Sequence, residues 1–315
     1  MEPKTGAFVC MPASDRDELV KINAKLKEKL LQHTQHPGDY QTDIESMILL
    51  RREFASSSEK TFEKPLAAFV IQGSKLSYFG GREYFYKENQ CLVAGLDMPA
   101  SFKAMPATPE EPFLSVFFYL DAKLITELSM EMSQKSPSKN VECEGVTVAD
   151  TDPELLDAVL RLVNVLDKPE QIPIRAPMLL RELHYFLLLG PYGALLRQVN
   201  TLGTQNNQIV QTIAWLRQNL AQPVRVDELA RKANMSTATL HRHFKNLTGL
   251  SPLQYIKHLR LHEAQRLMLL ENERASNAAL AVGYESITQF NREYKTMFGE
   301  PPYRDISRRR ENLLG

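Results

Sequence analysis

The last third of the chain contains one helical pattern twice, and this repeat restricts the possible fold more than any other feature of the sequence. Ser236 and Ser286 lie 50 positions apart, and the same offset joins four further pairs: Arg242 with Arg292, Lys245 with Lys295, Gly249 with Gly299, and Pro252 with Pro302. Each copy has a short apolar helix, a turn residue suited to a left-handed backbone, a serine at an N-cap position and a second, amphipathic helix. From about Gln205 onward the sequence therefore predicts two helix-turn-helix motifs.

The second helix of each copy has one apolar face and one polar face. The apolar stripes are Leu240, Phe244 and Leu247 in the first copy, and Phe290, Tyr294 and Met297 in the second. The opposite faces and the two serines are predicted to contact DNA, through Ser236, Thr237, Ala238, His241, Arg242 and Lys245, and through Ser286, Ile287, Thr288, Asn291, Arg292 and Lys295. Arginine can bond guanine twice, asparagine can bond adenine twice, and alanine or threonine methyl groups can contact the thymine methyl. A solvated polar face would explain one copy, but it explains two copies in the same register less well.

A long amphipathic helix is predicted between the two motifs, from Pro252 to about Glu271. A helix of about nineteen residues has a length of roughly 28 Å. One turn of DNA is about 34 Å long, so both recognition helices are expected to enter successive major grooves on one face of the duplex.

The charge of the chain is divided unequally, although the formal net charge is zero. From Gln205 to the end there are 16 lysines and arginines against 10 aspartates and glutamates, and the remainder has 22 against 28. A basic part beside an acidic part indicates a polyanionic partner for the basic part alone.

The N-terminal part predicts an α+β domain. An amphipathic helix is expected from Asp15 to Gln35, and three helices follow the strands, at Ala122–Glu131, Pro153–Leu166 and Ala176–Leu189. Short β-favouring runs separated by turn residues predict a small antiparallel sandwich or barrel, with strands at Ala67–Gln72, Lys75–Phe79, Arg82–Tyr86, Gln90–Ala94 and Phe113–Tyr119. The predicted domains are therefore residues 1–200 and 209–315, with a polar linker at 201–208.

The C-terminal part closely resembles the AraC-type transcription regulators. Segments that carry the resemblance lie between Ile209 and Asp305, and include Asn234-Met235-Ser236, Leu240 to Lys245, Ser251-Pro252, Gly283 to Ser286, Phe298-Gly299 and Pro301-Pro302. By this resemblance Ala238, His241, Arg242, Thr288, Asn291 and Arg292 contact bases, whereas Ser236 and Ser286 lie near phosphates. The chain departs from many relatives at Ala275 and Ala278, where larger aliphatic residues are usual, and at Ala238 and Ile287, where some relatives have longer polar groups.

The N-terminal part resembles, less closely, the N-terminal domain of one AraC-type subfamily. The resemblance rests on Cys91 to Pro99, Glu111 to Leu114, Arg181 to Tyr185, and Gly190 to Gln198. It implies a cupin-like β-barrel with trailing helices that senses a small-molecule effector and self-associates. It also implies a homodimer that acts at promoter DNA, with RNA polymerase as a partner.

The effector site itself is not readable from the sequence, and its candidates are barrel aromatics and one cysteine: Phe69, Tyr78, Tyr84, Tyr86, Cys91 and Phe102. Such aromatics are more often core residues, and a buried cysteine is usually inert. Many cupins are metal enzymes, but no histidine lies between Pro65 and Leu120, so no imidazole-based metal site is expected.

We therefore predict a cytoplasmic, sequence-specific transcription regulator, most simply an activator, with no cofactor, no catalytic residues, no metal site and no membrane partner. Two alternatives stay open. In the first, the N-terminal domain only dimerises or binds a protein partner; in the second, it is a cupin-like enzyme that carries a DNA-binding appendage.

Overall fold

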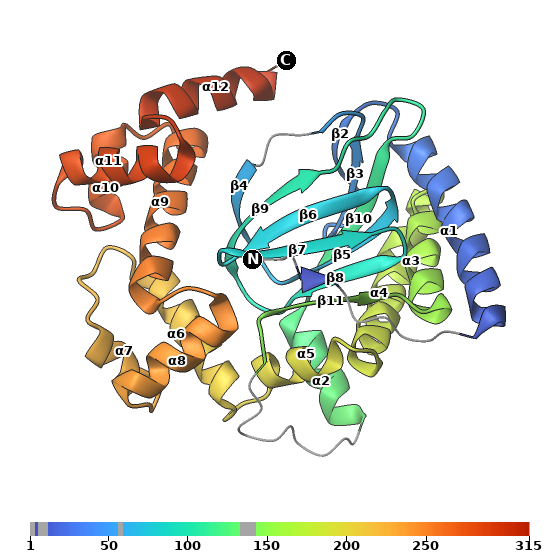
Figure 1. Ribbon diagram of the computed structural model, residues 1–315, viewed down its shortest axis with the longest axis horizontal. Helices are drawn as coiled ribbons and strands as arrows, with labels where there is room; N and C mark the ends of the chain where they lie inside the picture. Colours follow the sequence, from blue (N-terminus) through green and yellow to red (C-terminus); the bar gives the residue numbers. More distant parts are fainter. Residues whose placement is uncertain (1–3, 6–11, 56–58, 133–142, 315) are drawn as a thin grey trace.

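The computed structural model describes residues 4–5, 12–55, 59–132 and 143–314. It has an α+β N-terminal domain followed by an all-helical C-terminal domain, which confirms the predicted fold class (Figure 1). The described strands form two open sheets rather than one closed barrel. The first has the order β1-β7-β6-β9-β4 and the second has the order β11-β8-β5-β10-β3-β2.

The two sheets face each other, and their inner surfaces enclose the N-terminal core. Strand β5 is buried along its whole length, because the other sheet covers one face and helices cover the other. Strand β6 alternates between half-buried and buried residues, as expected for a strand with one inner face. The strands of the first sheet are β1 (Lys4–Thr5), β4 (Glu59–Glu63), β6 (Ser74–Phe79), β7 (Arg82–Lys87) and β9 (Met98–Ala104). Those of the second sheet are β2 (Gly38–Gln41), β3 (Met47–Arg52), β5 (Leu66–Gln72), β8 (Gln90–Ala94), β10 (Phe113–Tyr119) and β11 (Val146–Asp150).

Helices cover the outer face of the six-stranded sheet (Figure 1). Tyr192, at the start of the last of these helices, donates its hydroxyl to the backbone oxygens of Cys91 and Ala149 at 3.2 and 3.1 Å, and so joins helix to sheet. The N-terminal helices are α1 (Ala13–His33), α2 (Ala122–Glu131), α3 (Pro153–Val165), the 3-10 turn η1 (Pro169–Gln171), α4 (Ile172–Leu189) and α5 (Gly193–Asn200).

The C-terminal domain is helical throughout. Its helices are α6 (Gln205–Gln218), α7 (Val226–Lys232), α8 (Thr237–Thr248), α9 (Pro252–Leu270), α10 (Ala275–Ala281), α11 (Ile287–Phe298) and α12 (Pro302–Leu314). Helix α9 begins at a capping box, in which the Ser251 hydroxyl caps the Gln254 N–H and the Gln254 side chain accepts from the Ser251 N–H. None of the described helices is both long and apolar enough to span a bilayer.

The segment between the two domains is short and well anchored. Residues 205–208 of the predicted linker form the first turn of α6, so only residues 201–204 lie between helices. Thr204 caps α6, and the Asn207 amide donates to the backbone oxygen of Val199 at 2.8 Å. One hydrophobic cluster extends from the sheets through α6 to the first helix-turn-helix motif, whereas the second motif has a separate cluster.

Candidate nucleic-acid interface and N-terminal pocket

The first helix-turn-helix motif consists of α7, a tight turn and α8. Asn234 in the turn has a φ of 52°, a left-handed value that asparagine tolerates better than most residues. The Ser236 hydroxyl accepts a hydrogen bond from the Thr239 N–H at 3.2 Å and so caps α8. Helix α8 ends at Gly249, which also has a left-handed backbone. The start and end of the recognition helix are therefore both set by local sequence.

The second motif, formed by α10 and α11, repeats this geometry. Gly283 has a φ of 86° in the turn, and the Ser286 hydroxyl accepts from the Gln289 N–H at 3.2 Å. Helix α11 ends at the left-handed Gly299 and has 12 residues, as α8 does. The alanine-rich α10 buries Ala278 and Ala279 completely against α9. The structure thus confirms two helix-turn-helix motifs in the same register.

The predicted DNA-contacting residues lie together on the outer faces of α8 and α11. All twelve are exposed except Ile287, which is half-buried. The apolar stripes Leu240, Phe244, Leu247 and Phe290, Tyr294, Met297 are buried on the opposite sides of the two helices. This arrangement presents two similar polar faces to a ligand, although the individual contacts stay predictions.

Arg260 of α9 links the two motifs. Its guanidinium donates to three backbone oxygens: Leu220 at 3.0 Å and Gln222 at 2.8 Å, near the first motif, and Gly283 at 3.2 Å, in the turn of the second. Because one planar side chain holds both segments, α9 positions the motifs relative to each other.

The C-terminal end of α8 is held against the N-terminal domain. The Arg82 guanidinium donates to the backbone oxygens of Asn246 at 2.9 Å and Lys245 at 3.1 Å. The Gly145 N–H donates to the Leu247 oxygen at 2.9 Å. The carbonyls of Asn246 and Leu247 in the last turn of α8 would otherwise have no partner within the helix, whereas that of Lys245 also accepts from the Gly249 N–H at 2.8 Å.

Strand β4 forms a second contact between the domains. The Phe62 ring lies edge-on to Tyr255 and His262 of α9, with centroid separations of 5.6 and 5.7 Å. The Lys60 ammonium donates to the backbone oxygen of Met297 in α11. Burial lowers the pKa of His262 to about 3, and a second histidine of α9, His258, has its pKa lowered to about 4 for the same main reason.

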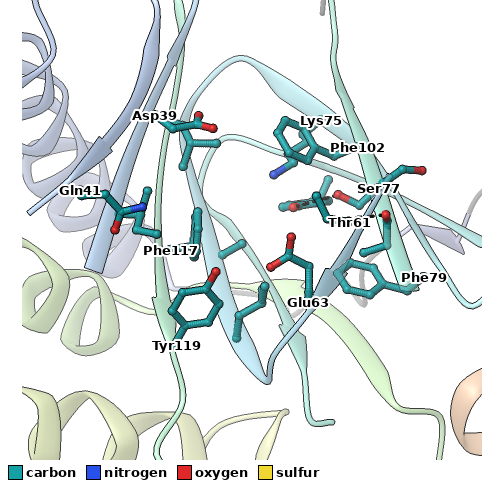
Figure 2. A pocket seen from close by; sticks show the side chains of 17 residues that line it. Asp39, Gln41, Thr61, Glu63, Lys75, Ser77, Phe79, Phe102, Phe117 and Tyr119 are labelled. Atoms are coloured by element: carbon teal, nitrogen blue, oxygen red, sulfur yellow. Dashed lines mark hydrogen bonds between the residues drawn. The ribbon is translucent and has the colours of Figure 1, made fainter. Parts of the chain in front are cut away.

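A cavity of about 200 Å³ lies between the two sheets. Thr61 and Glu63 of β4 line it, on the strand that contacts α9 through its other residues. Figure 2 shows Lys75 and Glu63 both directed into this space, with aromatic side chains around them. The remaining lining residues are Asp39, Gln41, Ile48, Leu50, Leu66, Ala68, Ser77, Phe79, Tyr86, Ala100, Ser101, Phe102, Phe117 and Tyr119.

Only two of the six candidate effector-contacting residues, Tyr86 and Phe102, line the cavity. Phe69 and Tyr84 are buried elsewhere, and Tyr78 is half-buried outside the lining. Cys91 is also fully buried, and burial raises the pKa of its thiol far above the usual value. Phe69, Tyr78, Tyr84 and Cys91 therefore do not line this cavity.

The charged residues of the cavity are not among the effector-contacting residues predicted from the sequence, which are aromatic residues and one cysteine. A signal was present in β6, where Lys75 and Ser77 alternate with the same period as the inward-facing Phe79. Glu63 lies in the polar run Glu59–Glu63, which has no strong β signal. Among the described residues, no three His, Cys, Asp or Glu side chains gather as a metal site.

Two family models match the chain. One is the AraC-type transcriptional regulator N-terminus, over residues 43–195, and the other is a helix-turn-helix domain, over residues 229–307. The order of the two matches is the order of the two domains in the structure. The chain belongs to the AraC-type transcription regulators.

The AraC-type relatives are similar to parts of the chain. The HTH-type transcriptional activator RhaS of Citrobacter koseri is 34% identical over 137 residues, which cover 42% of this chain and 48% of RhaS. The HTH-type transcriptional regulator ArgR of Pseudomonas aeruginosa is 29% identical over 111 residues, which cover 35% of this chain and 34% of ArgR. The chain thus spans about half or less of the length of these relatives.

The fold is similar to that of solved structures with little sequence similarity. ToxT from Vibrio cholerae with an unsaturated fatty acid bound has a TM-score of 0.54 and 11% identity, and the superposition covers 86% of this chain and 97% of ToxT. ToxT bound to a naphthalenyl butenoic acid has a TM-score of 0.55 and 12% identity, with 83% and 98% covered. At this identity the likeness shows a shared fold.

Proposed function

We propose that this AraC-type protein is a sequence-specific DNA-binding transcription regulator, acting as an activator under the control of a small-molecule effector. The observation that carries the DNA-binding function is the pair of exposed polar faces on α8 and α11, in one register and with matching caps. The basic excess of the C-terminal part favours the phosphate backbone. Activation is carried over from relatives named as activators, and RNA polymerase is the partner that activation of transcription implies.

Substitution of one arginine in each motif tests this proposal. A binding site is first selected from random duplex DNA with the full chain. Arg242→Ala and Arg292→Ala are then each expected to weaken binding by about 1–3 kcal/mol and to relax the preference at one base pair. Arg175→Ala, an exposed arginine on α4, serves as the charge-matched control. Unchanged affinity of both recognition-helix variants at matched salt would refute the assignment.

Effector control is supported by the position of β4. Thr61 and Glu63 line the cavity, whereas Lys60 and Phe62 contact α11 and α9. A ligand that moves this strand therefore has a direct route to the DNA-binding domain. The ToxT structures were solved with acids bound, which is compatible with a ligand-binding role for this fold.

Such control requires reciprocal coupling: a ligand that changes DNA affinity must itself bind differently when DNA is present. Phe62→Ala tests the route, because it removes the ring between Tyr255 and His262 and leaves the cavity lining intact. The variant should bind the ligand normally and lose its effect on DNA affinity. Retention of the full effect would exclude this route.

Homodimer formation is supported by an exposed apolar stripe on α4. Ile174, Met178, Tyr185 and Leu189 are 71, 67, 38 and 50% exposed and recur at helical spacing. The stripe is symmetric about its midpoint, so a second copy packed antiparallel would pair Ile174 with Leu189 and Met178 with Tyr185. This is the self-complementarity that a two-fold interface requires.

Sedimentation analysis tests this surface. Met178→Glu should shift the full chain from dimer to monomer, because it places a charge against Tyr185 of the second copy. Val20→Glu, which changes an exposed apolar residue of α1, is the matched control and should leave the dimer intact. Equal dimerisation of the two variants would rule out the α4 stripe as the interface.

A further inference from the structure

The cavity between the sheets contains a buried lysine that forms no ion pair with any residue that the structure describes. Lys75 is only 6% exposed, and its ammonium lies 3.9 Å from the centroid of the Phe102 ring. No described carboxylate forms an ion pair or hydrogen bond with this ammonium. Burial lowers the pKa of Lys75 to about 8, while the carboxylate of Glu63 acts in the opposite direction. A buried cation without a hydrogen-bonded counter-ion is costly unless a ligand supplies one.

A carboxylate of the same cavity also lacks an ion pair. Glu63 forms none with a described residue, and its neighbouring donor is the Tyr119 hydroxyl, whose pKa is raised to about 12 by burial, by the charge of Glu63 and by the hydrogen bond to it. Asp39, the other acid of the lining, already pairs with Arg52. The cavity therefore offers one positive group and one negative group, neither of which forms an ion pair with a described residue.

The two charges restrict the ligand to one class. A simple carboxylate would pair with Lys75 and leave Glu63 uncompensated, and a simple amine would do the reverse. A zwitterion pairs with both and keeps the net charge of the site at zero, which minimises the cost of burial. The volume of about 200 Å³ and the rings of Phe79, Phe102 and Phe117 suit a short, partly apolar body.

We propose that this cavity binds a small amino carboxylate, whose carboxylate contacts the Lys75 ammonium and whose ammonium contacts the Glu63 carboxylate. The proposal rests on the proposed effector control of the regulator and specifies the chemistry of its ligand. Because Glu63 belongs to β4, the ligand ammonium also engages the strand that contacts α9.

The test is a calorimetric titration of the full chain with free L-amino acids and short ω-amino acids. Each zwitterion is matched by the amine and the carboxylate that lack one of its charges. At least one zwitterion should bind, and its singly charged counterparts should bind at least tenfold more weakly. Binding of no zwitterion at millimolar concentration overturns the proposal.

Three variants assign the contacts. Lys75→Met and Glu63→Gln should each weaken zwitterion binding at least thirtyfold. Lys103→Met, an exposed lysine on the neighbouring strand β9, should bind as the native protein does. Lys75→Met should also melt no lower than the native chain without ligand, because it removes an unpaired buried charge. Native affinity in both cavity variants overturns the proposal.

DNA binding, measured on the same preparations, separates this inference from the proposed function. If a singly charged or uncharged molecule fills the cavity and changes DNA affinity, the ligand class is wrong and effector control stands. If a zwitterion binds and DNA affinity is unchanged, the ligand class is right and the control is wrong.

Discussion

Replacement of Gly80 by alanine tests the contact between the N-terminal domain and α8. Gly80 and Gly81 both have left-handed backbones, with φ of 55° and 79°. A Cβ on Gly80 would lie 1.7 Å from the backbone oxygen of Thr248, whereas a Cβ on Gly81 would meet nothing within 4 Å. Gly81→Ala is therefore a control with a similar backbone cost, of about 1–2 kcal/mol, and no collision between domains.

The collision in Gly80→Ala can be relieved only by movement, because the obstructing atom belongs to the backbone. Contacts of a Cβ below 3.0 Å are essentially never seen, so the hairpin and the end of α8 must separate by more than 1 Å. The hydrogen bonds from Arg82 and Gly145 to α8, now at 2.9–3.1 Å, would then exceed hydrogen-bonding distance. At about 0.5–1.5 kcal/mol each, their loss makes Gly80→Ala about 2–4 kcal/mol less stable than Gly81→Ala.

Thermal unfolding and amide exchange measure this difference. Gly80→Ala should melt several degrees below Gly81→Ala, and exchange should increase in the β6–β7 hairpin and in the last turn of α8. The buried core of the sheets should keep its protection. Equal melting temperatures and equal exchange in the two variants would refute the packing of α8 on this hairpin.

Three further predictions concern buried titratable groups. Asp305→Asn should destabilise the second motif by about 2–4 kcal/mol in urea unfolding, because its fully buried carboxylate accepts hydrogen bonds from four side chains, including two arginines; a neutral result would contradict this. The free energy of unfolding should decrease as the pH falls from about 6.5 to about 4, since the pKa values of His258 and His262 are lowered in the folded chain and only the unfolded chain binds protons at these histidines in that range. His258→Gln should make the free energy of unfolding depend less steeply on pH. Cys91 should resist iodoacetamide in the native chain at pH 8 because burial raises the pKa of its thiol, and rapid labelling would show that it is accessible.

The regular elements with strong local signals could be predicted closely. The predicted strands Gln90–Ala94 and Phe113–Tyr119 and the predicted helix Ala122–Glu131 coincide with β8, β10 and α2. The strands β4 and β9 were missed, because the first is polar and the second contains Pro99. These two strands belong to the sheet that encloses the cavity, so their omission also hid Glu63.

The sequence by itself determined the two recognition helices. Their N-caps, left-handed glycines and apolar stripes are local signals, which act between residues a few positions apart and need no tertiary context. For this reason the outer faces of α8 and α11 could be assigned to individual residues from the order of amino acids alone.

Only the tertiary structure decided the contents of the cavity and the contact between the domains. Lys75 and Glu63 line the same cavity because β6, β9 and β4 pair in that order. Gly80 packs against the backbone of Thr248, which lies 168 positions further along the chain. Such contacts depend on strand order and on the packing of distant segments, and neither produces a periodic pattern of residues from which it could be predicted. The DNA-binding surface is therefore a local property of this chain, and the site proposed to regulate it is a property of the whole fold.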